Sequence, residues 1–280
     1  MTTAATHAAP IGLLAGWGRF PVLFAEKAKS LGHRVVCVGI RGMADRAAIE
    51  PHVHRFYWTR LASLGRPINC FKREGVRSWT MAGKVFKINI FHRPWRLMPD
   101  LRMIRFWWFR QRRNNADDNI TLGIIDEFTK EGMTCMSALD LCPELLVNAG
   151  LLTKRKLTAS EEKDIAYGWE LGKEMGRLDI GQSVIVRNRA VLAVEAIEGT
   201  DRAIQRAGEL CQSGGFVVVK VAKPQQDMRF DVPAIGVSTI ETMSKVGGRV
   251  LAIEAGKTIL LDEEATIAAA DRHGITITAL

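Results

Sequence analysis

The sequence lacks paired cysteines, long apolar runs and a leader segment. Its five cysteines show no CxxC and no other paired spacing, which favours a reduced, cytosolic protein over a disulfide-stapled one. It contains no run of about 20 uncharged apolar residues, so we expect no membrane-spanning helix. The first nine residues have neither the basic start nor the apolar core of a signal peptide. We therefore expect a cytoplasmic protein.

Several catalytic signatures are also missing. The six histidines form no metal-ligand cluster, and no GxSxG or Cys–His arrangement supports nucleophilic catalysis. Segment 176–183 has the glycine spacing of a phosphate-binding loop, but Gln182 replaces the required lysine, which excludes an ATPase. Gly16 and Gly18 begin like a dinucleotide fingerprint, yet Pro21 stands where the third glycine belongs. They indicate a nucleotide or phosphate contact, or only a tight strand-to-helix turn.

Strand-like and helix-like patterns alternate along all 280 residues, which is typical of an α/β fold. The polar, Lys/Thr-rich stretch 148–159 looks like a linker. We predict an N-terminal Rossmann-like domain with a parallel sheet over 1–147, which binds nucleotide or substrate. A C-terminal mixed α/β catalytic domain is predicted over 160–280. In this second half the pattern predicts a final hairpin, with strands at 250–254 and 258–261.

Most of the net charge of +9 lies in one segment. Residues 84–113 contain nine Lys and Arg against Asp100 alone, which gives +8. A helix there would place Arg102, Arg105 and Arg112 on one face, with Leu97, Leu101, Ile104 and Trp108 on another. A basic helix with tryptophans suits an anionic membrane surface, and we rank nucleic acid below it. A helix whose aromatic residues fill a core remains the alternative.

The densest group of charged residues follows a buried strand, within 217–236. The strand runs into a loop rich in cations and carboxylates, namely Lys220, Lys223, Asp227, Arg229 and Asp231. Two carboxylates four residues apart can hold a hard divalent cation, and the cations can bind phosphate oxygens. The simpler interpretation is a solvated, salt-bridged loop. The flanking Pro224 and Pro233 favour a fixed loop and hence a site.

A second loop repeats this pattern, because Glu195, Thr200 and Asp201 lie where another strand gives way to a helix. If the two loops are neighbours, Glu195 can join Asp227 and Asp231 around one metal. Asp117 and Asp118 stand at the start of a helix, where capping is the default role.

The order and spacing of the motifs resemble one family over essentially the whole chain, the UDP-2,3-diacylglucosamine pyrophosphatases of the LpxI type. The matching segments are Gly16 to Pro21, Ala82-Gly83-Lys84-Val85, Asp117-Asp118, Leu178 to Gln182, Val194 to Ala196, Glu198 to Asp201, Lys223-Pro224, Gln226-Asp227, Arg229, Asp231 to Pro233, Ile235-Gly236, Glu254 to Lys257 and Ala268 to Asp271.

This resemblance implies a hydrolase of lipid A and lipopolysaccharide biosynthesis that uses Mg²⁺ or Mn²⁺. It would split UDP-2,3-diacylglucosamine into UMP and 2,3-diacylglucosamine 1-phosphate at the inner-membrane surface, with a homodimer as a possible assembly. Asp231 is the implied catalytic residue, supported by Asp227, and the metal ligands would be Asp231, Asp227 and Glu195. The expected substrate contacts are Gly16, Gly18, Lys84, Asp117, Asp118, Thr200, Asp201, Lys220, Lys223 and Arg229. A non-catalytic basic protein that binds anionic lipid or nucleic acid through 84–113 is the alternative.

Overall fold

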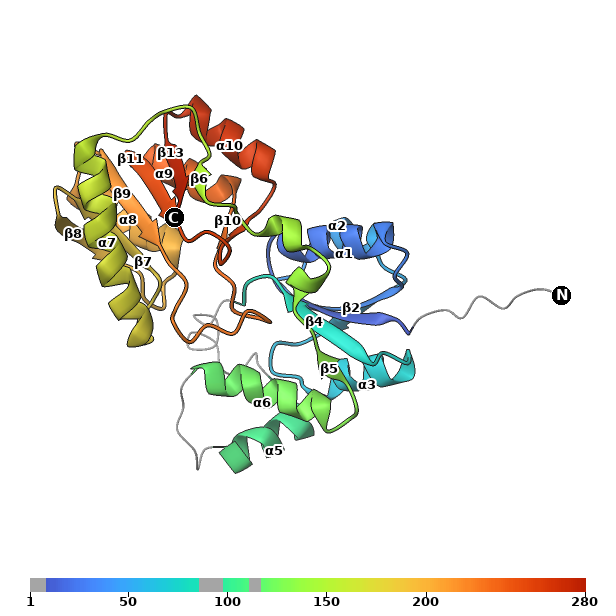
Figure 1. The fold of residues 1–280 in the computed structure, drawn as a ribbon. Coiled ribbons are helices and arrows are strands. Elements are labelled where there is room, and N and C mark those ends of the chain that lie inside the picture. Colours follow the sequence, from blue (N-terminus) through green and yellow to red (C-terminus); the bar gives the residue numbers. More distant parts are fainter. Residues whose placement is uncertain (1–8, 86–97, 111–116) are drawn as a thin grey trace. The chain divides into compact units, whose positions relative to one another are not determined.

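The computed structural model describes residues 9–85, 98–110 and 117–280, and side chains at 109–110 and 117–119 lie outside the description. The chain divides between Cys142 and Pro143 into two compact units, an N-terminal and a C-terminal one (Figure 1). No described helix is both long and apolar enough to cross a bilayer.

The N-terminal unit is built on a five-stranded parallel sheet in the order β3-β2-β1-β4-β5. The strands are β1 (Ile11–Ala15), β2 (Val35–Ile40), β3 (Arg55–Thr59), β4 (Ser78–Ala82) and β5 (Thr134–Cys135). Parallel strands that are covered on both faces consist of apolar runs, as in the wholly buried β2. Strand order reverses between β1 and β4, which makes their carboxyl ends the switch point where doubly wound sheets bind ligands.

Helices α1 (Phe20–Ser30), α2 (Arg46–Ile49), α3 (Gly65–Arg73), α5 (Leu101–Arg110) and α6 (Asp117–Thr129) accompany this sheet, with short 3₁₀ turns at Glu50–His52 and Ala138–Asp140. An aromatic cluster joins α3, β4 and α6. The rings of Trp79 and Phe128 stack with centroids 3.8 Å apart, and Phe71 packs beside both. All three rings are fully buried, so they form the centre of this core.

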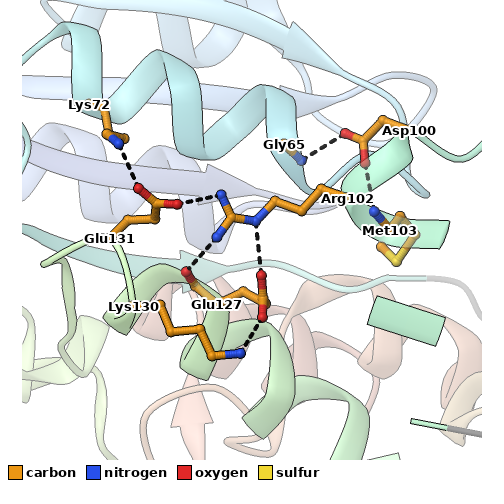
Figure 2. Close-up of polar contacts among 8 residues, drawn as sticks. All are labelled: Gly65, Lys72, Asp100, Arg102, Met103, Glu127, Lys130 and Glu131. Carbon is orange, nitrogen blue, oxygen red and sulfur yellow. Dashed lines mark hydrogen bonds and ion pairs between the residues drawn. The ribbon is translucent and has the colours of Figure 1, made fainter. Parts of the chain in front are cut away.

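Charged contacts attach α5 to α6 (Figure 2). The Arg102 guanidinium donates to Glu127 Oε2 at 2.9 Å and to Glu131 Oε1 at 2.7 Å. Lys72 of α3 adds a 2.6 Å contact to Glu131. Arg102, predicted on one helical face with Arg105, is therefore paired with Glu127 of α6 and with Glu131 just after it. Arg112, the third predicted member of that face, lies outside the described residues.

The C-terminal unit contains a six-stranded mixed sheet in the order β6-β13-β11-β9-β7-β8. Its strands are β6 (Gly150–Leu151), β7 (Ser183–Arg187), β8 (Ala190–Val194), β9 (Phe216–Lys220), β11 (Gly248–Ile253) and β13 (Thr276–Ala279). Strands β9, β11 and β13 are parallel, whereas β7 is antiparallel to β8 and β9, and β6 to β13. Stretch 148–159, predicted as a linker, thus contains the edge strand β6.

Helix α7 (Ala159–Arg177) starts with a capping box between Thr158 and Glu161 and packs on one face of the sheet, where Ile165 meets Val217 and Val219. The other face packs against α8 (Thr200–Leu210), α9 (Val237–Lys245) and α10 (Glu263–Arg272). Strand β9 is thus covered on both sides, and its carboxyl end projects the charged loop that begins at Lys220.

The predicted final hairpin is wrong. Strand β12 (Ile259–Leu260) pairs in parallel with β10 (Ala234–Ile235) in a separate two-stranded sheet. Strand β11 cannot accept it, because β9 and β13 already occupy both of its edges.

Candidate functional site

A buried polar cluster lies at the carboxyl end of β9. Lys220 Nζ donates to Thr200 Oγ1 at 2.6 Å, and Thr200 in turn donates to Glu195 Oε1 at 3.0 Å. Ser183 donates to Glu195 Oε2 at 2.5 Å, and Lys220 Nζ lies 3.8 Å from that same oxygen. All four side chains are buried, with Lys220 only 5% exposed. Charge neutralisation by Glu195 makes the burial of this lysine tolerable.

Whether the two loops are neighbours was left open by the sequence, and the structure joins Glu195 and Thr200 of one to Lys220, where the other begins, although their strands are not neighbours. Strand β7 lies between β8 and β9, and its first residue, Ser183, is opposite Lys220 in the antiparallel register. The backbone N–H of Glu195 also donates to the Ser183 carbonyl at 2.8 Å. Ser183 therefore bridges the loops, although the sequence analysis did not select it. Its place directly after Gly181-Gln182, at the start of an apolar run, was the available signal.

Gly181 brings this cluster together by close packing. A Cβ atom at this position would lie 2.0 Å from the Glu195 carbonyl oxygen, so only glycine lets the two backbones approach this closely. The preceding Asp179 accepts a 2.5 Å bond from Lys223 Nζ. Asp179 is thus a second polar residue of the site that the sequence analysis did not select, although it lies in a motif that carries the family resemblance.

The loop after β9 folds around a tight turn in which Asp231 N donates to Asp227 O at 3.1 Å. Lys223 Nζ lies 3.9 Å from Asp231 Oδ2. Arg229 forms several bonds to the Asp227 carboxylate, the shortest at 2.6 Å, and this guanidinium holds the pKa of Asp227 below its ordinary value. Asp227 and Arg229 are therefore partners of each other, and Asp231 faces Lys223.

Lys173 and Glu254 anchor the start of the same loop. Glu254 Oε2 accepts the Ala222 backbone N–H at 2.8 Å and Lys173 Nζ at 2.6 Å. Burial tends to raise the pKa of Glu254, but the hydrogen bonds from Lys173 and Lys257 leave it below the ordinary value. Glu254 stays ionised and fixes where the loop leaves the sheet.

The predicted three-carboxylate metal set is not assembled. Among the described residues, no three His, Cys, Asp or Glu side chains are close enough to hold a metal ion. Glu195 accepts hydrogen bonds from hydroxyl groups and lies beside Lys220. Of the predicted metal ligands, Asp227 and Asp231 therefore remain, and these two lie on one turn. Mg²⁺ in phosphate-processing sites needs only one or two carboxylates, because the substrate phosphates and water supply the other ligands. The buried Gln182 Oε1, which has no hydrogen-bond partner within the described part of the chain, adds a suitable oxygen donor in the adjacent motif. These donors fit a magnesium ion held jointly with substrate.

In the N-terminal unit the predicted glycine contacts lie at the switch point. Trp17 and Lys84 exchange backbone hydrogen bonds of 2.8 and 2.9 Å, which join the ends of β1 and β4. A Cβ on Gly16 would lie 2.7 Å from the Lys84 carbonyl oxygen, so Gly16 permits this close packing. Gly18 has φ +107° and open space around it, so a ligand has room to approach.

Three further predicted substrate contacts are Asp201, whose side chain the structure describes, and Asp117 and Asp118, whose side chains it does not. At the start of α8, Asp201 accepts a 3.1 Å hydrogen bond from Thr239 of α9. Asp117 and Asp118 are the first residues of α6, but their side chains lie outside the described part of the chain. Their substrate contacts, like those of Thr200, Lys220 and Lys223, stay predictions.

A two-domain α/β protein with a phosphate-compatible switch point and a loop of carboxylates and cations has the features of an enzyme that acts on phosphate esters or anhydrides. The LpxI N-terminal domain model matches residues 10–145, and the LpxI C-terminal domain model matches 148–278. The UDP-2,3-diacylglucosamine pyrophosphatase LpxI of Caulobacter vibrioides is 31% identical over 277 residues, which covers 95% of this chain and 96% of that protein. The chain therefore belongs to the LpxI family of pyrophosphate-bond hydrolases.

Proposed function

We propose that this protein hydrolyses the pyrophosphate bond of UDP-2,3-diacylglucosamine to UMP and 2,3-diacylglucosamine 1-phosphate, with Mg²⁺ or Mn²⁺, in lipid A biosynthesis. The observation that carries the proposal is the match to a LpxI pyrophosphatase along nearly the full length of both chains. The loop of Asp227, Arg229 and Asp231 at the end of a buried strand supplies groups suited to this chemistry. A purely lipid- or nucleic-acid-binding protein would need none of them.

Each charged group of the loop has a proposed role. Asp231, which is one turn from Asp227 and 3.9 Å from Lys223, binds the metal or accepts the proton of the attacking water. Lys223 and Arg229 contact phosphate oxygens, whose negative charge increases as the phosphate leaves. When bound, the metal supplies charge neutralisation at the phosphates. Glu195 keeps Lys220 and Thr200 in place next to this loop.

The substrate has two acyl chains, so we also propose that the protein works at the inner-membrane surface. The exposed Trp107 and Trp108 of α5 would contact the lipid interface. A homodimer remains a prediction that light scattering of the purified chain tests.

The test incubates purified protein with UDP-2,3-diacylglucosamine in detergent and measures UMP, with Mg²⁺ and with excess EDTA. We expect UMP with Mg²⁺ and none with EDTA. Asp231→Asn should lower kcat by at least about 100-fold, the size of a lost general acid–base contribution. Asp126→Asn, which changes an exposed carboxylate on α6, is the matched control and should retain full activity. Absence of UMP from the wild-type protein would refute the substrate, and an active Asp231→Asn variant would refute the assigned role.

A further inference from the structure

A groove opens at the carboxyl ends of β2 and β3 in the N-terminal unit. Its volume is about 1350 Å³, and its walls come from β3, α3 and residues 98–102. Among the residues that the structure describes, its lining includes no predicted substrate or metal residue. Neither the family resemblance nor the proposed chemistry assigns it a role.

The groove is strongly basic. Arg41 follows β2, Arg60 follows β3, and Arg66 and Arg73 project from α3, all four exposed. Within the described residues, the guanidinium groups of Arg41 and Arg60 have no acidic partner. Arg66 donates to a backbone carbonyl, and Arg73 has a contact of 3.8 Å to Glu74. Guanidinium groups gathered this way repel one another and favour a multivalent oxygen anion such as phosphate.

The single carboxylate among the described lining residues is already in use. Asp100 accepts the Gly65 N–H at 2.7 Å and the Met103 N–H at 2.8 Å, and it thereby caps α3 and α5 (Figure 2). It also accepts a bond from Ser63 at 2.7 Å. Asp100 consequently fixes the wall of the groove, and the hydrogen bonds that hold it go to Ser63, Gly65 and Met103 rather than to Arg41 or Arg60.

One rim of the groove is apolar and exposed. Met98 and Leu101 line it and are 61% and 81% exposed. The same side of α5 continues with Ile104 and Trp108, three and seven residues after Leu101, and Trp108 is 71% exposed. Because Arg102 and Asp100 hold α5 in place, this apolar row lies beside the arginines in a fixed geometry. A row of large apolar side chains in water marks a surface that meets an apolar partner.

We propose that the groove binds the phosphate head group of an anionic membrane phospholipid, while Leu101, Ile104 and Trp108 enter the apolar boundary of the bilayer. This rests on the proposed membrane association and gives it a specific site. A soluble phosphate or nucleotide would satisfy the arginines but would leave the adjoining apolar row in water. An amphiphile with an anionic head satisfies both.

The test is vesicle flotation of the full-length protein at low and moderate salt. Vesicles contain either phosphatidylcholine alone or phosphatidylcholine mixed with phosphatidylglycerol. The groove variant combines Arg41→Gln and Arg60→Gln, and the apolar variant combines Leu101→Ser and Trp108→Ser. The matched control combines Arg34→Gln and Arg77→Gln, because these exposed arginines precede β2 and β4 at the opposite edge of the same sheet. Thermal unfolding verifies that every variant is folded.

We expect wild type and control to float with the anionic vesicles, and the groove variant to bind about 10- to 30-fold more weakly, since each basic residue near an anionic surface contributes a few-fold in affinity. The apolar variant should also lose binding, whereas the groove variant should release UMP from detergent-dispersed substrate at the wild-type rate. Equal losses in the groove variant and the control would show that only net charge matters and would overturn the proposal. Equal binding of wild type to both vesicle types would overturn it as well.

A second experiment tests whether the groove binds a soluble phosphate compound instead of a lipid head group. Wild type and the groove variant are titrated with UMP and with glycerol phosphate while tryptophan fluorescence is followed. Tight binding of UMP that Arg41→Gln and Arg60→Gln abolish would make the groove a nucleotide site and refute the lipid assignment. If wild type binds anionic vesicles but releases no UMP from the lipid substrate, the hydrolase proposal fails while the head-group site stands.

Discussion

The buried pair of Lys220 and Glu195 offers a quantitative test of the candidate site. Lys220→Met replaces the ammonium group by an apolar side chain that is one atom shorter, and it takes the positive charge away from the buried Glu195. Removal of one member of a buried ion pair costs about 3–5 kcal/mol. Since Ser183 and Thr200 still donate to Glu195, we take the lower end, about 3 kcal/mol. For a unit of this size that corresponds to a fall of about 10 °C in Tm.

The double variant Lys220→Met with Glu195→Gln makes the test decisive. It removes both charges, and the side-chain oxygen of the introduced glutamine still accepts a hydroxyl bond, so the double variant should be no less stable than either single variant. Differential scanning calorimetry of the full-length protein measures each Tm, and the exposed Lys245→Met controls for loss of a lysine. If the losses of the two single variants simply add in the double variant, Lys220 and Glu195 are not coupled and the reasoning is refuted.

Three further outcomes follow from local geometry. Gly181→Ala places a Cβ 2.0 Å from the Glu195 carbonyl oxygen, so it should destabilise the C-terminal unit by about 1–3 kcal/mol in urea unfolding, and an unchanged midpoint would contradict this contact. Arg229 lowers the pKa of Asp227, so the stabilisation by this ion pair is present above the unfolded pKa of about 3.9 and disappears as pH falls through the lower folded value. Arg229→Met should therefore lower Tm at neutral pH but not at pH values below the folded pKa, and a pH-independent difference would argue against the ion pair. Burial raises the pKa of Cys37, so this thiol should resist alkylation in the native protein and react after unfolding, as peptide mass spectrometry reports.

The sequence alone determined the local structure wherever an apolar run is short and closed by turn residues. Strands Ile11–Ala15, Val35–Ile40 and Ser78–Ala82 and helix Glu263–Arg272 are segments of this kind, and the predicted α/β class in two domains is confirmed. Glycines, prolines and caps at their ends act locally, so they can be read without the rest of the fold. The family resemblance is confirmed for the same reason, because it depends on the order of motifs and not on their contacts.

Only the tertiary structure decided which residues meet. Strand β7 inserts between β8 and β9, so Ser183 joins Glu195 and Lys220, a pairing that no local pattern encodes. The second strand of the predicted hairpin pairs elsewhere because both edges of β11 are occupied. Arg102 turns toward Glu127, 25 positions further along the chain, and leaves Trp108 exposed. Strand pairing and ion pairing depend on partners distant in sequence, whereas helix and strand formation depend mainly on neighbours, and this difference separates what was predictable from what was not.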